Sequence, residues 1–188
     1  MTPPTDLPMR AFADRAAFEA WLEAEHATAP GLYVQLFRKG SGVPSLTYAE
    51  LVESVLCFGW IDGRSNTVDE RSYTIRTTPR RPRSVWSQKN VDTVGRLLAE
   101  GRMRPAGLAQ VEAAQADGRW DRAYAGPASA TVPDDLAAAL AAEPAAERAF
   151  AALGAQDRYA VLYRVQTAAT PATRTKRIAA AVARLAGG

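Results

Sequence analysis

The residues best suited to binding chemistry lie in one basic segment near the middle of the chain. Between residues 76 and 90, arginines and a lysine stand beside two prolines, a tryptophan and an asparagine. Arginine binds phosphate and carboxylate groups through paired hydrogen bonds, and the first turn of a helix offers backbone amides to the same anions. We therefore predict a pocket for an anionic, planar ligand such as a nucleotide. Its predicted residues in this segment are Arg76, Arg80, Arg81, Trp86, Ser87, Lys89 and Asn90.

A plainer interpretation of these arginines has equal weight. Charge runs are usually solvated faces, and Asp62, Asp69 or Asp121 could pair with the arginines instead. The local excess is nevertheless large, because residues 64–104 hold ten Lys or Arg against four Asp or Glu, a balance of +6 in a chain of net charge +3. Such an excess favours an anionic partner, either a small molecule or an acidic protein surface.

Trp60 and Asp62 follow a predicted helix and complete the predicted binding surface. A loop at this position would present an indole and a carboxylate to a pocket. The competing interpretation, which we favour, places Trp60 in the core, since large aromatic residues are more often buried than functional. In that interpretation Asp62 and Gly63 form a turn.

Nucleophilic and metal-dependent catalysis have little support in the sequence. The one cysteine, Cys57, and the one histidine, His26, stand in different predicted helices without a surrounding motif, whereas a cysteine nucleophile needs a nearby base. The sequence contains no phosphate-binding loop, nucleophile elbow, zinc-protease motif or dinucleotide fingerprint. We therefore predict no metal and no cofactor. Enzymatic activity is left open, with a non-enzymatic protein favoured.

Periodic patterns predict the elements that would position these residues. Thr47 and Glu50 have the spacing of a capping box, which starts a helix. Residues 78–83 should run extended, because the residue before a proline avoids the helical region. We expect helices at 12–26, 47–59, 88–100 and 105–115 and strands at 32–37, 66–68 and 72–77, with further helices after residue 133.

These elements predict an α+β fold, a small antiparallel sheet packed with helices and followed by an all-helical C-terminal segment. The predicted organisation is a disordered leader at 1–10, an α+β body at 11–125, a linker at 126–132 and a helical segment at 133–188. We expect a cytoplasmic protein without a membrane span, because no apolar run reaches about 18 residues and no signal-peptide pattern opens the chain. The single cysteine suits a reducing compartment.

Four stretches stand out by their order and spacing: LCFGWIDG at 56–63, TPRRPRSVWSQKN at 78–90, GRMRPAG at 101–107 and GRWD at 118–121. Together they resemble the YdeI/OmpD-associated (bacteriocin-protection, OmdA-like) family. With the pairs Thr173-Arg174 and Arg177-Ile178, the resemblance covers nearly the whole chain after the leader. It implies an association with envelope stress and bacteriocin protection, and no settled reaction. Members tend to carry an Ala-Lys-Arg-x-Glu-Thr-Arg-like motif, whereas residues 168–174 read AATPATR, so a site that uses that lysine and glutamate would be weakened or absent.

Three functions follow in order of preference. The first is a stress-related, bacteriocin-protection-type protein that acts through a basic anion-binding or partner-binding surface. The second is a small-molecule enzyme that acts on a phosphorylated or carboxylated metabolite at the same place. The third is a weak nucleic-acid binder, ranked last because the sequence lacks zinc-finger spacing, an RNA-recognition motif and a helix-turn-helix. The oligomeric state and the protein partners stay open.

Overall fold

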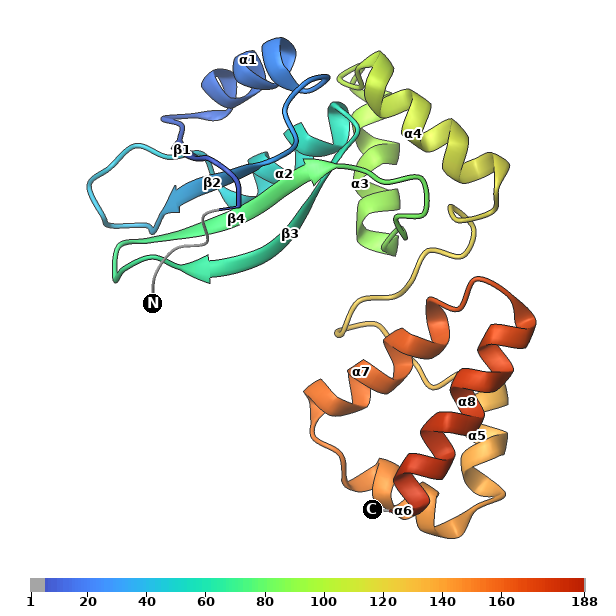
Figure 1. Cartoon of the computed structure of the whole chain (residues 1–188). Helices are drawn as coiled ribbons and strands as arrows, with labels where there is room; N and C mark the ends of the chain where they lie inside the picture. The colour runs from blue at the N-terminus through green and yellow to red at the C-terminus, as the bar shows by residue number, and fades with distance from the viewer. Residues whose placement is uncertain (1–5, 188) are drawn as a thin grey trace. The chain divides into compact units, whose positions relative to one another are not determined.

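A computed structural model describes residues 6–187 of the chain. The chain divides into two compact units, and each is described by itself. The first unit runs up to residue 84 and again from 92 to 117, and the second comprises residues 85–91 and the chain from 118 onward. The predicted α+β class is confirmed, because the described residues form a four-stranded sheet and eight helices and the C-terminal part is all helical (Figure 1).

The first unit is built on a sheet with the strand order β1-β2-β4-β3. Strand β1 pairs parallel with β2, and the other pairs are antiparallel, so the sheet is mixed. The first five residues of the predicted leader lie outside the described residues, and β1 begins within its last part. The strands are β1 (Met9–Ala11), β2 (Leu32–Phe37), β3 (Trp60–Thr67) and β4 (Ser72–Pro79).

Strands β3 and β4, which contain the strands predicted at 66–68 and 72–77, pair as an antiparallel hairpin, but the predicted turn at Asp62-Gly63 is wrong. Both residues lie inside β3, which begins at Trp60. The pairing changes along the strand, since Asp62 lies opposite Thr77 while Ser65 lies opposite Ile75. Three steps on β3 therefore match two steps on β4, and β3 carries one extra residue. A glycine inside a strand commonly marks such a β-bulge.

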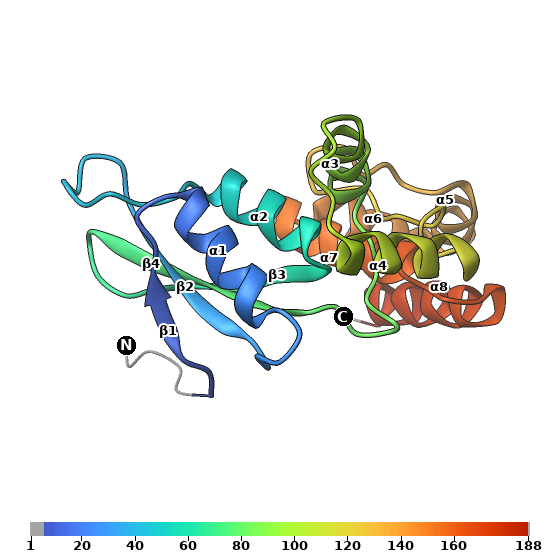
Figure 2. The ribbon, with the colours of Figure 1, turned by 90° about the horizontal axis from the view of Figure 1, so that it is seen from above.

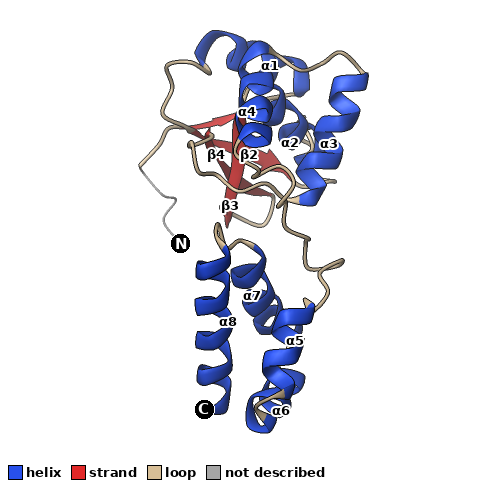
Figure 3. Cartoon of the chain, turned by 90° about the vertical axis from the view of Figure 1, so that its right-hand side faces the viewer, coloured by secondary structure: helices blue, strands red, loops and turns tan. Residues whose placement is uncertain are grey.

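Helices α1 (Arg15–Glu25) and α2 (Tyr48–Cys57) lie on one side of this sheet (Figures 2 and 3). Asp14 caps α1 by accepting a hydrogen bond from the backbone N–H of Ala17 at 2.8 Å. The predicted capping box of α2 is confirmed, with Thr47 and Glu50 each bonding the other's backbone N–H. The core between helices and sheet is apolar and includes Phe18, Leu22, Leu32, Val34, Leu36, Leu51, Val55 and Ile75.

Helix α4 (Pro105–Ala116) packs closely against the C-terminal end of α2, and glycine makes this approach possible. A Cβ atom added at Gly107 would lie 2.3 Å from the carbonyl oxygen of Cys57 and 2.7 Å from that of Leu56. Such distances exclude every side chain, so Gly107 fixes how near the two helices lie. Helix α3 (Gln88–Ala99) precedes α4 in the chain.

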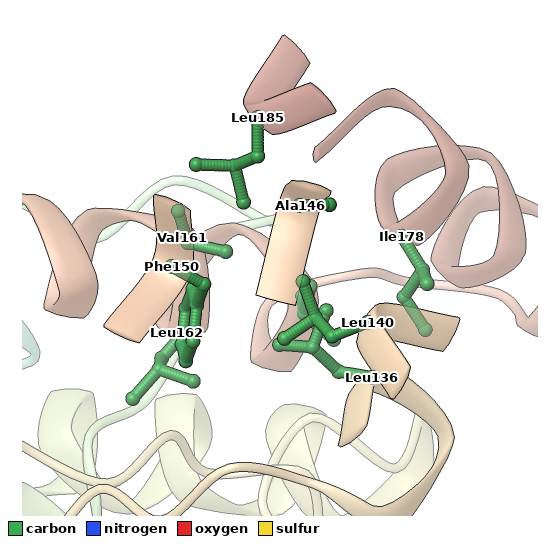
Figure 4. Packing of buried hydrophobic residues seen from close by; sticks show 9 residues of the cluster. Leu136, Leu140, Ala146, Phe150, Val161, Leu162, Ile178 and Leu185 are labelled. Carbon is green, nitrogen blue, oxygen red and sulfur yellow. The ribbon is translucent and has the colours of Figure 1, made fainter. Parts of the chain in front are cut away.

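The second unit contains α5 (Asp134–Ala141), α6 (Pro144–Ala152), α7 (Ala155–Gln166) and α8 (Pro171–Ala186). Thr170 caps α8 by accepting from the backbone N–H of Thr173 at 3.1 Å. Leucine, isoleucine, valine and phenylalanine side chains from all four helices meet in one core (Figure 4). Within residues 6–187, no helix has both the length and the apolar character needed to cross a bilayer.

Candidate functional site

The nine residues predicted to bind a ligand divide between the two units. Trp60, Asp62, Arg76, Arg80 and Arg81 belong to the first unit, and Trp86, Ser87, Lys89 and Asn90 to the second. Their surroundings differ widely, from core to solvent.

Trp60 lies in the core of the first unit. Its side chain is 1% exposed, and its indole N–H donates to the backbone carbonyl of His26 at 3.0 Å. Its ring meets Trp21 edge-on, with the centroids 5.8 Å apart. A buried indole with a satisfied N–H positions α1 against β3 and leaves little surface for a ligand.

Asp62 and Arg76 face opposite sides of the sheet. Asp62 is paired with Thr77, so these two side chains share a face, and Arg76, the next residue back along β4, points to the other one. There Arg76 forms an ion pair with Asp6 at 3.4 Å. The strand geometry thus separates two residues that the sequence prediction placed together.

Arg80 and Arg81, which stand between Pro79 and Pro82, have different environments. Arg80 is 6% exposed, and its backbone N–H donates to the carbonyl of Gly59 at 3.1 Å. Arg81 is exposed, and its backbone N–H donates to the hydroxyl of Ser84 at 3.0 Å. Arg80 is therefore part of the packed interior, whereas Arg81 reaches solvent.

The four predicted residues of the second unit surround the start of α3. The hydroxyl of Ser87 accepts a hydrogen bond from the backbone N–H of Asn90 at 3.1 Å and so caps the start of the helix. Trp86 is 2% exposed and packs edge-on against Trp120, with ring centroids 5.0 Å apart. Lys89 is exposed. The indole predicted as a stacking surface is thus buried against another indole.

A hollow in the first unit offers a further candidate site, and we call it the β2–α2 hollow. Its volume is about 730 Å³, within the range of small-molecule sites. It follows the loop that joins β2 to α2, together with one residue of β4. Its lining residues are Phe37, Arg38, Lys39, Gly40, Ser41, Gly42, Val43, Pro44, Ser45, Leu46, Thr47, Tyr48 and Tyr73.

The loop that forms this hollow is held by hydrogen bonds at both sides. Arg71 donates from Nη2 to the carbonyl of Ser41 at 2.6 Å, and the backbone N–H of Phe37 donates to the hydroxyl of Ser45 at 3.1 Å. Gly40 and Gly42 have φ values of 87° and 77°, in the left-handed region that favours glycine. The backbone amides of both glycines lack an acceptor among residues 6–187.

The lining of the β2–α2 hollow is electropositive. Arg38 and Lys39 contribute two positive charges, and none of its lining residues is acidic. The Arg38 guanidinium lies over the ring of Tyr73, 5.3 Å from its centroid, which holds the cation beside an aromatic surface. Lys39 is exposed and forms no ion pair with any described residue. Together with the two glycine amides, these groups can bind an anion.

Asp62 reaches the edge of this hollow through Tyr48. The hydroxyl of Tyr48 donates to Oδ2 of Asp62 at 2.6 Å, and Tyr48 itself lines the hollow. A phenol and a carboxylate joined by a short hydrogen bond form a pair that can exchange a proton with a bound molecule. The predicted residue Asp62 is thus connected to the hollow by a direct hydrogen bond to one of its lining residues.

Cys57 is poorly suited to nucleophilic chemistry. Its side chain is 2% exposed, and burial raises the pKa of the thiol to about 11, although Arg102 nearby acts in the opposite direction. Beyond this thiol, the described residues contain no group of three or more His, Cys, Asp or Glu placed to hold a metal ion.

Two parts of the chain match known protein families. Residues 10–110, more than half of the 188 residues, match the model of a family described as a domain of unknown function, DUF8412. The chain belongs to the DUF8412 family. Residues 129–188 match the family described as Bacteriocin-protection, YdeI or OmpD-Associated, which confirms the predicted family over the C-terminal part. Neither the curated proteins nor the solved structures that were compared with the chain gave a match.

These matches assign the features described above to different families. The β2–α2 hollow and all nine predicted ligand residues lie within the DUF8412 match, and helices α5 to α8 lie within the other. The four stretches that carry the resemblance all precede residue 129, so the confirmed family covers less of the chain than the resemblance did.

Sequence reasoning missed the residues that line the hollow. Arg38, Lys39 and Tyr48 were not chosen, because residues 39–44 were interpreted only as a connecting loop. The sequence did contain a signal, because Gly40 and Gly42 follow directly after the adjacent cations Arg38 and Lys39. Glycine-rich loops beside cations are a common way to present backbone amides to an anion.

Proposed function

We propose that this protein of the DUF8412 family binds a phosphorylated or carboxylated small molecule in the β2–α2 hollow. The observation that carries the proposal is the lining itself, in which Arg38, Lys39 and two open glycine amides occur without an acidic residue. Val43 and Tyr48, which are 37% and 40% exposed, supply apolar surface for the rest of the ligand. A volume of about 730 Å³ has room for more than the anionic group alone.

The proposal connects this binding with a bacteriocin-protection-type role in the cytoplasm. The family match of residues 129–188 supports the role, and Cys57, a free buried thiol, suits a reducing compartment. In this proposal the first unit recognises an anionic metabolite and the protein acts by binding. The ligand role predicted from the sequence for the nine residues between Trp60 and Asn90 stays a prediction.

The test is a thermal-shift and calorimetric screen against nucleoside monophosphates, sugar phosphates and dicarboxylates. We expect saturable stabilisation by one ligand class, and a clearly smaller stabilisation in the Arg38→Ala/Lys39→Ala double variant. Both side chains are exposed and the contact of Arg38 with the Tyr73 ring is lost, so the free energy of unfolding of the variant should stay within about 1 kcal/mol of that of the unmodified protein.

A charge-matched control removes two exposed cations elsewhere, Arg10 and Lys176. The Arg10→Ala/Lys176→Ala variant should bind the ligand as the unmodified protein does. If both double variants lose affinity to the same extent, and the loss disappears in higher salt, the attraction is general and the hollow is not the site.

A second candidate function is favoured by the Tyr48–Asp62 hydrogen bond. An enzyme that acts on the same ligand would use this pair for proton transfer. Tyr48→Phe would then keep the affinity, because the ring remains, and would abolish turnover. Detection of product from the ligand identified above, and its absence in Tyr48→Phe, would replace the binding role by a catalytic one.

A further inference from the structure

A second basic hollow lies in the helical unit, and we call it the arginine hollow. It has a volume of about 170 Å³, and its lining residues are Val161, Arg164, Arg177, Ala180, Ala181 and Arg184. Three guanidinium groups therefore share a small concave surface whose other side chains are apolar. Arg177 and Arg184 stand two helical turns apart on α8, so they project from one face, while Arg164 comes from α7.

The three arginines lack the acidic partners that arginine usually has. Arg174, on the same helix, forms an ion pair with Asp135 at 2.6 Å. By contrast, none of the three lining arginines forms an ion pair with any residue from 6 to 187. Like charges brought together without compensation repel one another, and a bound anion would remove that cost.

Arg177 is fixed in a position where it can still donate. Its Nη1 atom donates to the carbonyl of Arg164 at 2.6 Å and to the hydroxyl of Thr167 at 3.2 Å. A guanidinium carries five N–H donors. Within the described residues, neither Nε nor Nη2 of Arg177 donates a hydrogen bond. The group is half-buried, so little side-chain entropy remains to be lost when an anion binds.

We propose that the arginine hollow binds the phosphate group of a small molecule, either inorganic phosphate or a phosphate monoester. Its volume of about 170 Å³ is below that of a site for a whole cofactor, so it fits an anionic group. Three guanidiniums match a doubly charged group with several oxygens better than a singly charged carboxylate. The alanines and Val161 form an apolar floor that strengthens the attraction.

The site is tested in full-length protein that carries Arg38→Ala/Lys39→Ala, so that the β2–α2 hollow does not contribute. Inorganic phosphate and glycerol phosphate are titrated by calorimetry, with sodium chloride at equal ionic strength as the reference. We expect one saturable site, about tenfold or more weaker after Arg184→Ala. Lys176→Ala, which removes an exposed cation of α8 outside the hollow, should leave the affinity unchanged. The stronger of the two probes identifies the source of the phosphate.

Several outcomes would overturn the proposal. One is the absence of saturable phosphate binding in this background, and another is equal affinity before and after Arg184→Ala. Arg164→Ala gives an independent variant, since Arg164 is also exposed and its loss should not affect folding. Binding only to duplex DNA, with an affinity that falls steeply with salt, would show a general basic face. Different substitutions disrupt the two hollows, so a negative result for one proposed site does not bear on the other.

Discussion

The hydroxyl of Tyr48 donates a 2.6 Å hydrogen bond to Oδ2 of Asp62. This contact joins the first turn of α2 to β3, a strand at the edge of the sheet. It also places the predicted carboxylate beside a cationic hollow without placing it in the lining. The hollow therefore keeps its positive charge while an acid–phenol pair stands at its edge.

Tyr48→Phe should lower the free energy of unfolding slightly. The substitution removes one hydrogen bond and keeps the ring, and bonds of this kind contribute about 0.5–1.5 kcal/mol. We expect the lower end, because the pair is exposed. Urea denaturation measures the change, and an unaltered midpoint would show that the bond contributes no measurable stability.

Glu53→Gln should destabilise the first unit more strongly. Glu53 is 18% exposed, accepts a hydrogen bond from Arg102 at 2.7 Å and forms a further ion pair with Arg96. The two guanidiniums then keep only part of their compensation, from Glu19 and Glu100, so we expect a loss of about 1–2 kcal/mol. Glu112→Gln is the matched control, since Glu112 is exposed on α4 and should change stability by less than about 0.5 kcal/mol.

The stability difference between the unmodified protein and Glu53→Gln should depend on pH. Burial acts to raise the pKa of Glu53, but hydrogen bonds from Arg102 and Arg96 outweigh it and hold the pKa below its ordinary value. The contribution of a carboxyl with a lowered pKa is complete above its unfolded-state pKa of about 4.3. It disappears as the pH falls through the lower pKa of the folded state. Denaturation curves at pH 7 and at several acidic values would show whether the difference shrinks in that direction.

Cys57 should resist disulfide reagents in the native protein. Burial raises the pKa of its thiol to about 11, so at pH 8 only about one molecule in a thousand would carry the thiolate even if the group were accessible. Full reaction is expected after unfolding in denaturant. A reaction in the native state as fast as in denaturant would contradict the buried position.

Two glycine-to-alanine substitutions in helices should have opposite signs. Gly95 lies on α3 with open space where a Cβ would stand, so Gly95→Ala should stabilise by up to about 1 kcal/mol. At Gly107 the added atom would meet the carbonyl of Cys57, and a destabilisation of about 1–3 kcal/mol is expected from overpacking. Thermal melting of the two variants compares them directly, and equal shifts would show that α4 can move away from α2.

Local signals in the sequence predicted much of the fold, because they act over three or four residues. The capping box at Thr47 was recognised from side-chain type and spacing, and the strand at 32–37 was predicted with its observed bounds. The Asp62-Gly63 turn failed for the same reason. A local turn signal competed with pairing to β4, a partner that lies more than ten residues further along the chain, and pairing was stronger.

The candidate site could be predicted only in part, since it depends on which face each side chain takes. Asp62 was chosen for its type, but its partner Tyr48 belongs to another element. Trp86 was chosen as a stacking surface, and its burial against Trp120 could not be foreseen from the charges around it. Composition located an excess of cations along the chain, while tertiary packing decided which cations border a hollow.

The extra residue in β3 determines on which side of the sheet the Asp62 carboxylate lies. In an uninterrupted ladder that kept Ser65 opposite Ile75, Asp62 would lie opposite Thr78, one position further along β4 than its observed partner Thr77. Since neighbouring positions alternate between faces, the carboxylate would then point away from α2 and out of reach of Tyr48. The Tyr48–Asp62 hydrogen bond therefore depends on the one extra residue that β3 carries between Asp62 and Ser65.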